Sequence, residues 1–326
     1  MSNKPILIAD IGGTNARFAL ATQDHARFEQ AQTLECVEFK SVEFALDTYL
    51  HSHGIKNVSA ICLAVAGPII DETVTFPNSH WKISCNALRK RYATNQVRLL
   101  NDWEAIAYSL ATLQPTELLT IGQLKQDSMF DSKNFTLGAV GPGSGLGVAG
   151  LFSRNSQLLP LVTEGGHVGF APESPLQNQV LAFLHTKFDD RVSRERLLSG
   201  PGIVNIHEAL CSIHGVENPG LIAADIAVAG NSKSDPICAE TMLLFFEMLG
   251  QTAGDVALSL GAYDGVFIGG GIAQRYPTQL CESQFRKGFE NKGRHSHIMR
   301  SIPTSLITHK NPGLLGASVY AQKLMI

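Results

Sequence analysis

The sequence lacks the charge runs and long apolar segments that mark nucleic-acid-binding and membrane-spanning chains. Its 326 residues carry 26 Lys and Arg against 29 Asp and Glu, with no run of five or six basic residues. This balance leaves no electrostatic footprint for nucleic acid or an anionic membrane. The longest apolar segment, residues 238–260, is interrupted by Glu240, Glu247 and Asp255 and predicts a buried helix rather than a membrane span. Because no signal-peptide pattern is present, we expect a cytoplasmic protein with small-molecule partners, no nucleic acid and no membrane.

Cysteine is sparse, and no two cysteines form a C-x-x-C pair. That spacing favours neither a zinc knuckle nor a disulfide framework, so we expect reduced thiols with mostly structural roles. The six positions are Cys36, Cys62, Cys85, Cys211, Cys238 and Cys281.

Two common phosphate-binding motifs are missing or out of context. The Walker pattern G-x-x-x-x-G-K-[ST] is absent, which argues against a P-loop nucleotidase. Gly145, Gly147 and Gly150 match the dinucleotide fingerprint G-x-G-x-x-G, but the residues after them predict a strand and a loop where that site needs a helix. Any phosphate site in this chain therefore uses a motif other than these two.

Apolar runs rich in Ile, Val and Leu recur between helical patterns along the chain. Strands that alternate with helices predict an α/β architecture with largely parallel sheets. A length of 326 residues exceeds the usual size of one domain, so we expect two lobes. The polar segment 125–134 is a candidate boundary between them. The predicted strands lie within residues 6–11, 60–67, 97–102, 136–141 and 265–272.

Residues 6–20 and 136–151 share one plan: an apolar strand, a glycine-rich turn and a second strand. Two copies predict two similar lobes that offer backbone amides to opposite sides of one cleft. In the first copy Asp10 lies in an apolar run, where a carboxylate is unfavourable unless a cation lies beside it. Gly12 and Gly13 follow and let backbone N–H groups approach a ligand closely. Together these residues indicate a bound anion with its metal.

Glycine is dense in the second copy, where Gly141, Gly143, Gly145 and Gly147 alternate within seven residues. An ordinary hairpin turn needs one or two glycines, so this density favours contact with phosphate over a simple tight turn. A third cluster, residues 269–271, follows a predicted strand. It fits a backbone that packs against a base or ribose, and it fits close packing of a helix on a strand almost equally well.

Asn101 and Asp102 stand between a predicted strand and a predicted helix. Asp102 is therefore placed at the carboxyl end of a strand, where open α/β sheets bind ligands. A structural interpretation is also available, because Asn101 followed by Glu104 has the spacing of a capping box at a helix start. On the residues alone both interpretations stay open, and the structural one is favoured.

Glu164 and His167 bracket two glycines, which disfavour the helix that an E-x-x-H metal motif needs, and no second E-x-x-H occurs. A loop that holds an acceptor beside a donor suits neighbouring sugar hydroxyls instead. Glu195 lies between two arginines, and on the residues alone a solvated helix carboxylate explains it.

Seven short motifs occur in fixed order from the first strand to the last helix. They are DIGGTNAR, LLNDWEA, GPGSGLG, EGGHVGFAP, SRERLLSGPG, GVFIGGGI and NPGLLG. Together they resemble the ATP-dependent bacterial-type glucokinases, a non-ROK family of the hexokinase-like, actin-like ATPase superfamily. The related ROK sugar kinases carry a cysteine-rich zinc motif after a Gly-Gly-His segment, and no such cluster follows His167 in this sequence.

The resemblance implies a two-lobed actin-like, ribonuclease H-like ATPase fold with a cleft between the lobes. A small α/β lobe would span residues 1–112, with residues 303–326 returning to it, and a large α/β lobe would span residues 113–302. It also implies a homodimer that uses ATP with Mg²⁺, and no zinc, to phosphorylate D-glucose at its 6-hydroxyl, the first step of glycolysis.

The resemblance assigns roles to the residues that match the family's motifs. Asp102 matches the general base, and Asp10 matches the aspartate that faces Mg²⁺ through water. The sugar-binding residues would be Asn101, Glu164, His167 and Glu195. The nucleotide-binding residues would be Asp10, Gly12, Gly13, Thr14, Asn15, Gly141, Gly143, Ser144, Gly145, Gly269, Gly270 and Gly271.

Two places depart from the family pattern. The polar loop at residues 78–80 orders its residues differently, and Gly169 stands where the family often has aspartate, which removes a charge near His167. The rival functions are a sugar-responsive regulator and a chaperone-like or filament-forming ATPase. The first needs a nucleic-acid-binding module, for which the few residues before the first strand leave no room, and the second leaves the sugar-site residues unexplained.

Overall fold

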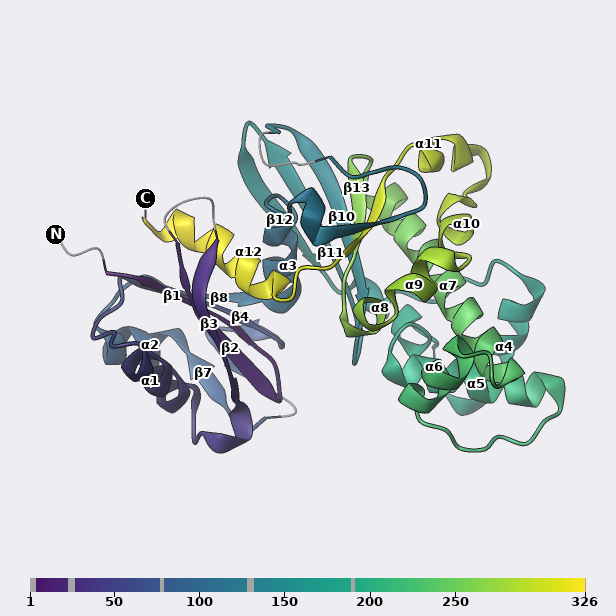
Figure 1. Ribbon diagram of the computed structural model, residues 1–326, viewed down its shortest axis with the longest axis horizontal. Helices are drawn as coiled ribbons and strands as arrows, with labels where there is room; N and C mark the ends of the chain where they lie inside the picture. The colour runs from purple at the N-terminus through teal and green to yellow at the C-terminus, as the bar shows by residue number, and fades with distance from the viewer. Residues whose placement is uncertain (1–3, 23–26, 77–78, 128–131, 189–190, 326) are drawn as a thin grey trace.

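The computed structural model describes residues 4–22, 27–76, 79–127, 132–188 and 191–325. Figure 1 shows an elongated molecule in which the N-terminal strands form one end, the helices of residues 175–260 form the other, and a second sheet lies between them. Asn78, part of the polar loop singled out above, lies outside the described residues.

The first sheet has five strands in the order β3-β2-β1-β4-β8. The pairs β1–β2 and β2–β3 are antiparallel, whereas β1–β4 and β4–β8 are parallel. All of β4 is buried, as expected for a strand covered on both faces. The strands are β1 (Ile6–Ile11), β2 (Asn15–Ala21), β3 (Phe28–Glu35), β4 (Ala60–Val65) and β8 (Val97–Asn101).

Helices cover both faces of this sheet because successive side chains of a strand point to opposite sides. Leu7 and Ala9 of β1 face a core with α1 (Val42–Ser52) and α2 (Cys85–Tyr92). Their neighbours Ile6 and Ile8 face a second core with α12 (Pro312–Ala321), near the C-terminus, and α3 (Asp102–Ser109). The short strands β5 (Ile69–Ile70), β6 (Thr73–Thr75) and β7 (Lys82–Ser84) form a small third sheet.

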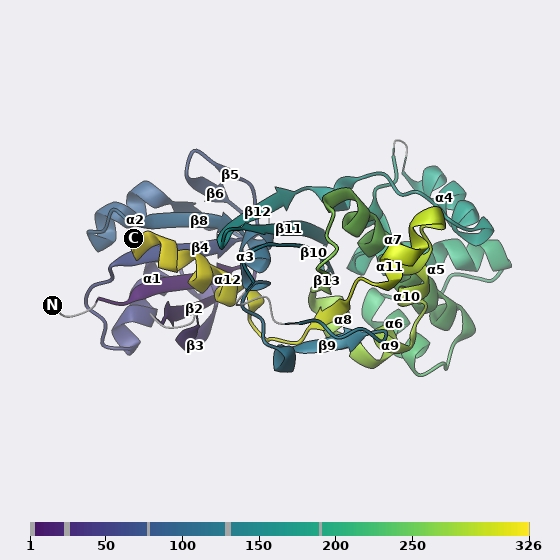
Figure 2. The ribbon, with the colours of Figure 1, turned by 90° about the horizontal axis from the view of Figure 1, so that it is seen from above.

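The second sheet has six strands in the order β12-β11-β10-β13-β14-β9. Figure 2 shows α3 beside β11 and β12, where this sheet approaches the first. The strands are β9 (Leu118–Ile121), β10 (Phe135–Pro142), β11 (Leu146–Arg154), β12 (Gln157–Thr163), β13 (Gly265–Ile268) and β14 (Thr304–Ile307). The helices around it are α4 (Pro175–Lys187), α5 (Gly200–His214), α6 (Ala223–Asn231), α7 (Pro236–Leu260), α8 (Gly271–Arg275), α9 (Pro277–Glu282), α10 (Phe285–Glu290) and α11 (Ser296–Arg300).

The predicted α/β elements are confirmed, and one predicted boundary is wrong. The five expected strands correspond to β1, β4, β8, β10 and β13, and the apolar segment 238–260 lies within α7. None of the helices in the described ranges combines the length and the apolarity needed to cross a membrane. Segment 125–134 does not separate two halves, because β9 before it and β10 after it belong to the same sheet. Polar composition marks a surface connection without revealing which elements it connects.

Candidate active site

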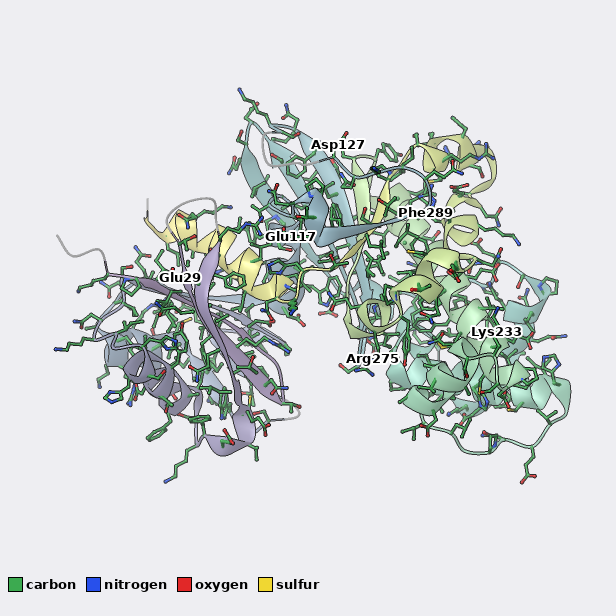
Figure 3. All side chains as sticks on the ribbon, in the orientation of Figure 1. Glu29, Glu117, Asp127, Lys233, Arg275 and Phe289 are labelled. Carbon is green, nitrogen blue, oxygen red and sulfur yellow. The ribbon has the colours of Figure 1, made fainter. Side chains whose placement is uncertain are left out.

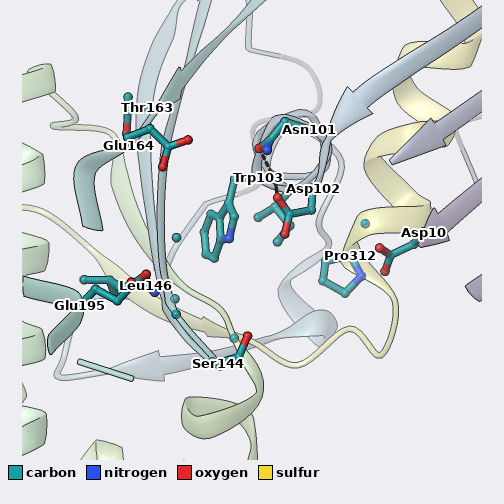
Figure 4. Close-up of a pocket in the computed structure, with 17 residues that line it drawn as sticks. Asp10, Asn101, Asp102, Trp103, Ser144, Leu146, Thr163, Glu164, Glu195 and Pro312 are labelled. Carbon is teal, nitrogen blue, oxygen red and sulfur yellow. Dashed lines mark hydrogen bonds between the residues drawn. The ribbon is translucent and has the colours of Figure 1, made fainter. Parts of the chain in front are cut away.

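A cavity of about 400 Å³ opens where the two sheets approach each other (Figure 4). Its walls come from the end of β1, the β8–α3 junction, the β10–β11 turn, the end of β12 and the start of α12. The predicted residues that line it are Asp10, Asn101, Asp102, Gly141, Gly143, Ser144, Gly145, Glu164, Glu195 and Gly270. The predicted residues that do not line it are Gly12, Gly13, Thr14, Asn15, His167, Gly269 and Gly271.

Asp10 enters the cavity from β1 and lies close to the start of α12. Burial raises the pKa of its carboxyl group, and the Arg17 guanidinium, 3.8 Å away, opposes that rise. A Cβ on Gly313 would lie 2.8 Å from the Asp10 carboxylate, so only glycine lets the helix start approach it this closely. An oxygen donor that is 24% exposed and has one cation within 4 Å among the described residues fits a hydrated Mg²⁺.

Asn101 caps the N-terminus of α3. Its side-chain oxygen has a structural role, whereas its side-chain nitrogen faces the cavity. Its side-chain oxygen accepts the N–H groups of Trp103 at 2.9 Å and Glu104 at 3.4 Å, and the Glu104 carboxylate accepts the Asn101 N–H at 3.3 Å. The capping box predicted from the spacing is therefore present. The Asn101 amide nitrogen has no hydrogen-bond partner in the described part of the chain and lines the cavity with the rest of the side chain.

Asp102 is the carboxylate best suited to proton transfer. Burial raises its pKa to about 6, helped by the negative charges of Asp10 and Glu164. The Trp103 N–H donates to Asp102 Oδ1 at 2.9 Å, which lowers the pKa and holds the carboxylate at the first turn of α3. A carboxylate with a pKa near neutrality is ionised at pH 7 and still accepts a proton readily.

Trp103 is a cavity residue that the sequence prediction missed. Its indole ring lies against the β10–β11 hairpin, where Gly141 and Gly147 are directly paired across the two strands (Figure 4). A Cβ on either glycine would overlap the ring. These two glycines therefore make room for Trp103, whereas the sequence prediction assigned Gly141 to nucleotide binding. The sequence did contain a signal for this contact: an aromatic residue directly follows Asp102, and glycines occupy alternate positions of the β10–β11 hairpin.

The other glycines of the hairpin differ in what they face. A Cβ on Gly143 would meet open space, so its backbone is accessible from the cavity. Gly145 lies against the Glu195 carboxylate instead. In the third cluster Gly270 has φ +80°, and a Cβ there would overlap the Pro142 carbonyl oxygen, so this position supports the close-packing interpretation.

Glu195 is not a solvated helix carboxylate. It lies in the short 3-10 turn η4 (Arg194–Arg196), and its Oε2 accepts the Leu146 N–H at 2.9 Å. Arg194 is fixed by an ion pair of 2.7 Å with Asp255 of α7. This network ties η4 to both β11 and α7, and it presents the Glu195 carboxylate at the cavity wall.

Glu164 precedes the 3-10 turn η3 (Gly165–His167), His167 ends it, and both side chains are open to solvent. His167 Nε2 lies 3.9 Å from Glu164 Oε2, and the side chains are 60% and 86% exposed. His167 lines a neighbouring basic cavity with Glu195 and Arg191, whose guanidinium donates to the His167 carbonyl at 2.9 Å. A Cβ on Gly169 would lie 3.6 Å from that guanidinium, so an aspartate at this position would face Arg191.

The first glycine turn stays outside the cavity lining. Gly12 donates its N–H to the Asn15 carbonyl at 3.0 Å, and the exposed Thr14 accepts the Cys36 N–H at 2.8 Å through its own carbonyl. Asn15 begins β2. Of the predicted residues in residues 10–15, only Asp10 therefore reaches the cavity in this arrangement.

A second, more apolar cavity of about 350 Å³ adjoins the first and shares Gly143 and Ser144 with it. The predicted nucleotide-binding residues that line it are Gly143, Ser144 and Gly271, and the sequence prediction missed the others. They include small residues of α6 and the pair Arg275 and Tyr276 at the end of α8, of which Arg275 is labelled in Figure 3. The run AADIAVAGN of α6 was the available signal, since small residues leave room beside a helix.

Comparison with known proteins gives a consistent picture. The family model described as Glucokinase matches residues 7–324. Glucokinases from Xylella fastidiosa strain M12 and Xanthomonas campestris pv. campestris strain B100 are 40% and 39% identical to this chain, each over 98% of the chain and 95% of the relative. A solved glucokinase from an Antarctic psychrotroph superimposes with a TM-score of 0.90 at 34% identity, over 98% of this chain and 99% of the other.

More distant structures agree in fold alone. A ROK family glucokinase from Streptomyces griseus, solved with glucose and AMPPNP, has a TM-score of 0.62 at 18% identity, over 98% of this chain and 99% of the other. The predicted actin-like fold and the non-ROK assignment are both confirmed. By family model, sequence identity and structural match alike, this chain belongs to the glucokinase family.

Proposed function

We infer that the chain is an ATP-dependent kinase that transfers a phosphoryl group to the 6-hydroxyl of D-glucose. The observation that carries this inference is Asp102, a carboxylate with a pKa of about 6 at the end of a strand, facing a cavity that continues past Gly143 and Ser144 into a second cavity. Phosphoryl transfer needs little covalent chemistry from a protein beyond positioning, charge stabilisation and a base.

The sugar occupies the first cavity. Asp102 accepts the proton of the 6-hydroxyl as the phosphoryl group is transferred. The amide of Asn101 and the carboxylates of Glu164 and Glu195 hold other hydroxyls, supplying donor and acceptors together. His167 joins the sugar site when the open cleft closes, and closure also excludes water, which competes as phosphoryl acceptor.

The nucleotide spans the two cavities. Backbone groups at Gly143 and Ser144, which line both, face the phosphates, and the more apolar second cavity receives the nucleoside. Asp10 holds Mg²⁺ through water, as its partly exposed carboxylate allows. The ion neutralises charge on the phosphates when it is bound. Gly12, Gly13, Thr14 and Asn15 belong to the same nucleotide side of the cleft.

The remaining assignments follow from the resemblance to the family. A small lobe of residues 1–112 and a large lobe of residues 113–302 close on the substrates. The expected return of residues 303–326 to the small lobe begins later than predicted, because β14 (Thr304–Ile307) pairs with β13 and β9 in the second sheet. Packing of α12 against β1 and α3 supports the return of the C-terminal segment to the small lobe. The protein acts as a cytoplasmic homodimer at the first step of glycolysis.

Sugar-dependent ADP release from Mg·ATP across a panel of hexoses, with identification of the phosphorylated product, tests this function. We expect release with glucose, glucose 6-phosphate as product and little release without sugar. Sugar-independent hydrolysis would support the filament-forming or chaperone-like ATPase instead. Glucose binding without turnover would support the regulator.

A further inference from the structure

Four side chains with metal-binding atoms gather between α5 and the start of α7, and none of them lines either cavity of the proposed active site. His207 and Cys211 stand one turn apart on α5, while Asp235 and Cys238 stand at the N-terminal end of α7. A ring nitrogen of His207, a carboxylate oxygen of Asp235 and Sγ of Cys238 all lie within 4.8 Å of one another.

Cys211 lies beside His207, outside the group of three whose donor atoms lie within 4.8 Å of one another. Its Sγ lies 3.8 Å from His207 Nδ1 and 3.9 Å from Nε2. His207 is 2% exposed, Cys211 is 3% exposed and Cys238 is fully buried. Three of the four side chains are therefore shielded from solvent, as the ligands of a structural metal site are.

The hydrogen bonds of the cluster leave donor atoms unused. Across the described ranges, the ring nitrogens of His207 have the Cys211 sulfur as their only hydrogen-bond partner. A buried imidazole with a weak sulfur partner is costly, because buried polar groups normally find a strong one. Asp235 Oδ1 accepts the Cys238 N–H at 2.8 Å as the cap of α7, and the same carboxylate lies within hydrogen-bonding reach of the Cys238 thiol.

The donor set identifies the metal. The spacing is H-x-x-x-C on one helix and D-x-x-C at the start of another, so two rigid pairs converge. Imidazole, thiolate and carboxylate groups together suit Zn²⁺, which takes four such ligands in tetrahedral structural sites. Mg²⁺ and Ca²⁺ prefer oxygen donors, and Asp235 is the one residue of the cluster with side-chain oxygens.

We propose that His207, Asp235 and Cys238 bind one Zn²⁺ that clamps α5 to the start of α7, and that rotation of the Cys211 side chain beside His207 brings its sulfur in as the fourth ligand. On binding, each thiol releases its proton to solvent, and the two thiolates and the Asp235 carboxylate set three negative charges against the two positive charges of the ion. Gly200, at the other end of α5, donates its N–H to the Gly143 carbonyl at 2.9 Å, so the clamped helix begins at the glycine turn.

The proposed site departs from the expectation of no zinc. That expectation rested on the absence of a ROK-type cysteine cluster after His167, whereas this site lies elsewhere in the chain and uses mixed ligands. The alternative is a metal-free cluster in which the Cys238 thiol donates to the Asp235 carboxylate. In that arrangement the Cys238 sulfur keeps its proton. The two arrangements differ in thiolate content, which a spectroscopic metal distinguishes.

Co²⁺ titrated into chelator-treated full-length protein provides the test. We expect a thiolate-to-cobalt charge-transfer band that saturates at one equivalent, and about half of that band after either Cys238→Ser or Cys211→Ser. Cys85→Ser is the matched control, because Cys85 is also a buried free cysteine but lies on α2. It should leave the band unchanged.

Asp235→Asn separates metal binding from folding. Asparagine caps a helix as well as aspartate does, so far-UV circular dichroism should be unchanged while the apparent dissociation constant for Co²⁺ rises about tenfold or more. Protein purified without metal-affinity steps should contain one Zn²⁺ per chain. Absence of a thiolate band in the unmodified protein overturns the proposal, and so does a band that persists undiminished after Cys238→Ser.

Discussion

The two glycine-turn hairpins occupy equivalent places in two similar sheets, yet they contribute different chemistry to the cleft. The orders β3-β2-β1-β4-β8 and β12-β11-β10-β13-β14 repeat one pattern of two antiparallel and two parallel pairings. The β1–β2 hairpin carries Asp10 and Arg17, whereas residues 135–153 of the β10–β11 hairpin contain no ionisable side chain. One hairpin therefore supplies a charge, and the other supplies backbone and the space left by missing side chains.

This difference shows how one strand-turn-strand frame serves both ends of a phosphoryl donor. A carboxylate in the first hairpin can hold a hydrated cation, but the same charge in the second would repel phosphate oxygens. The base Asp102 belongs to neither hairpin. It stands on the β8–α3 junction between them, and its neighbour Trp103 reaches across to rest on the second hairpin.

The largest effect is expected at the residue between the hairpins. Asp102→Asn keeps the size of the side chain but removes the base, so kcat should fall about 100- to 10,000-fold. Glucose affinity, measured by calorimetry, should change little because the other sugar contacts remain. Loss of glucose binding with turnover retained would mean that Asp102 binds sugar and is not the base.

Removing the charge of the first hairpin should have the next largest effect. Asp10→Asn should lower kcat/KM for Mg·ATP about 10- to 100-fold, because an amide attracts hydrated Mg²⁺ far less than a carboxylate does. Burial raises the pKa of Asp10, which means that its ionised form opposes folding above its ordinary value of 3.8. Urea unfolding at pH 7 should therefore show unchanged or higher stability. Lower stability with full activity would contradict a role in metal binding.

The second hairpin should respond to added volume instead of altered charge. Gly147→Ala forces a Cβ into the Trp103 ring and should destabilise the protein by about 1–3 kcal/mol. Gly143→Ala adds the same methyl group in open space, so its stability should stay within about 0.5 kcal/mol. Urea unfolding measures both. If Gly143 borders the phosphates, the effect of Gly143→Ala should be a higher KM for ATP and not a loss of stability.

A double-mutant cycle sharpens this contrast. Trp103→Ala removes the ring that Gly147→Ala would strike, so the two changes should not add. The destabilisation caused by Gly147→Ala should largely disappear in the Trp103→Ala background. Simple additivity would mean that Gly147 is needed for its backbone conformation and not for the indole.

The sequence predicted what depends on local pattern and short motifs. The strand at residues 6–11, the capping box at Asn101 and the position of Asp102 at a strand end follow from neighbouring residues, and the structure contains them. Contacts between distant segments could not be predicted in this way. Nothing near Gly147 in the sequence indicates that Trp103 lies on it, and nothing near Asp10 indicates that Gly313 does.

The position of His167 shows a further limit of sequence reasoning. A motif assigns it to the sugar, but its distance from the cavity depends on the relative position of η3 and the β8–α3 junction, which no local pattern fixes. Likewise the sequence analysis attributed all the glycines of the second hairpin to contact with phosphate. In the structure some of them face Trp103, one faces Glu195 and one faces open space.

The pH dependence of turnover offers the smallest and most specific distinction between the hairpins. The pKa of Asp102, about 6, predicts an acid limb in kcat/KM with activity about tenfold lower at pH 5 than at pH 7. The same raised pKa makes its contribution to stability fall as pH rises from 3.8 to about 6, because the folded state holds the proton that the unfolded state has lost. The negative charge of Asp10 helps to raise the pKa of Asp102, so Asp10→Asn should move the acid limb of the pH profile to lower pH. Gly143→Ala, a change in the uncharged hairpin, should leave the limb in place. Equal shifts in both variants would mean that the limb reports closure of the cleft and not ionisation of Asp102.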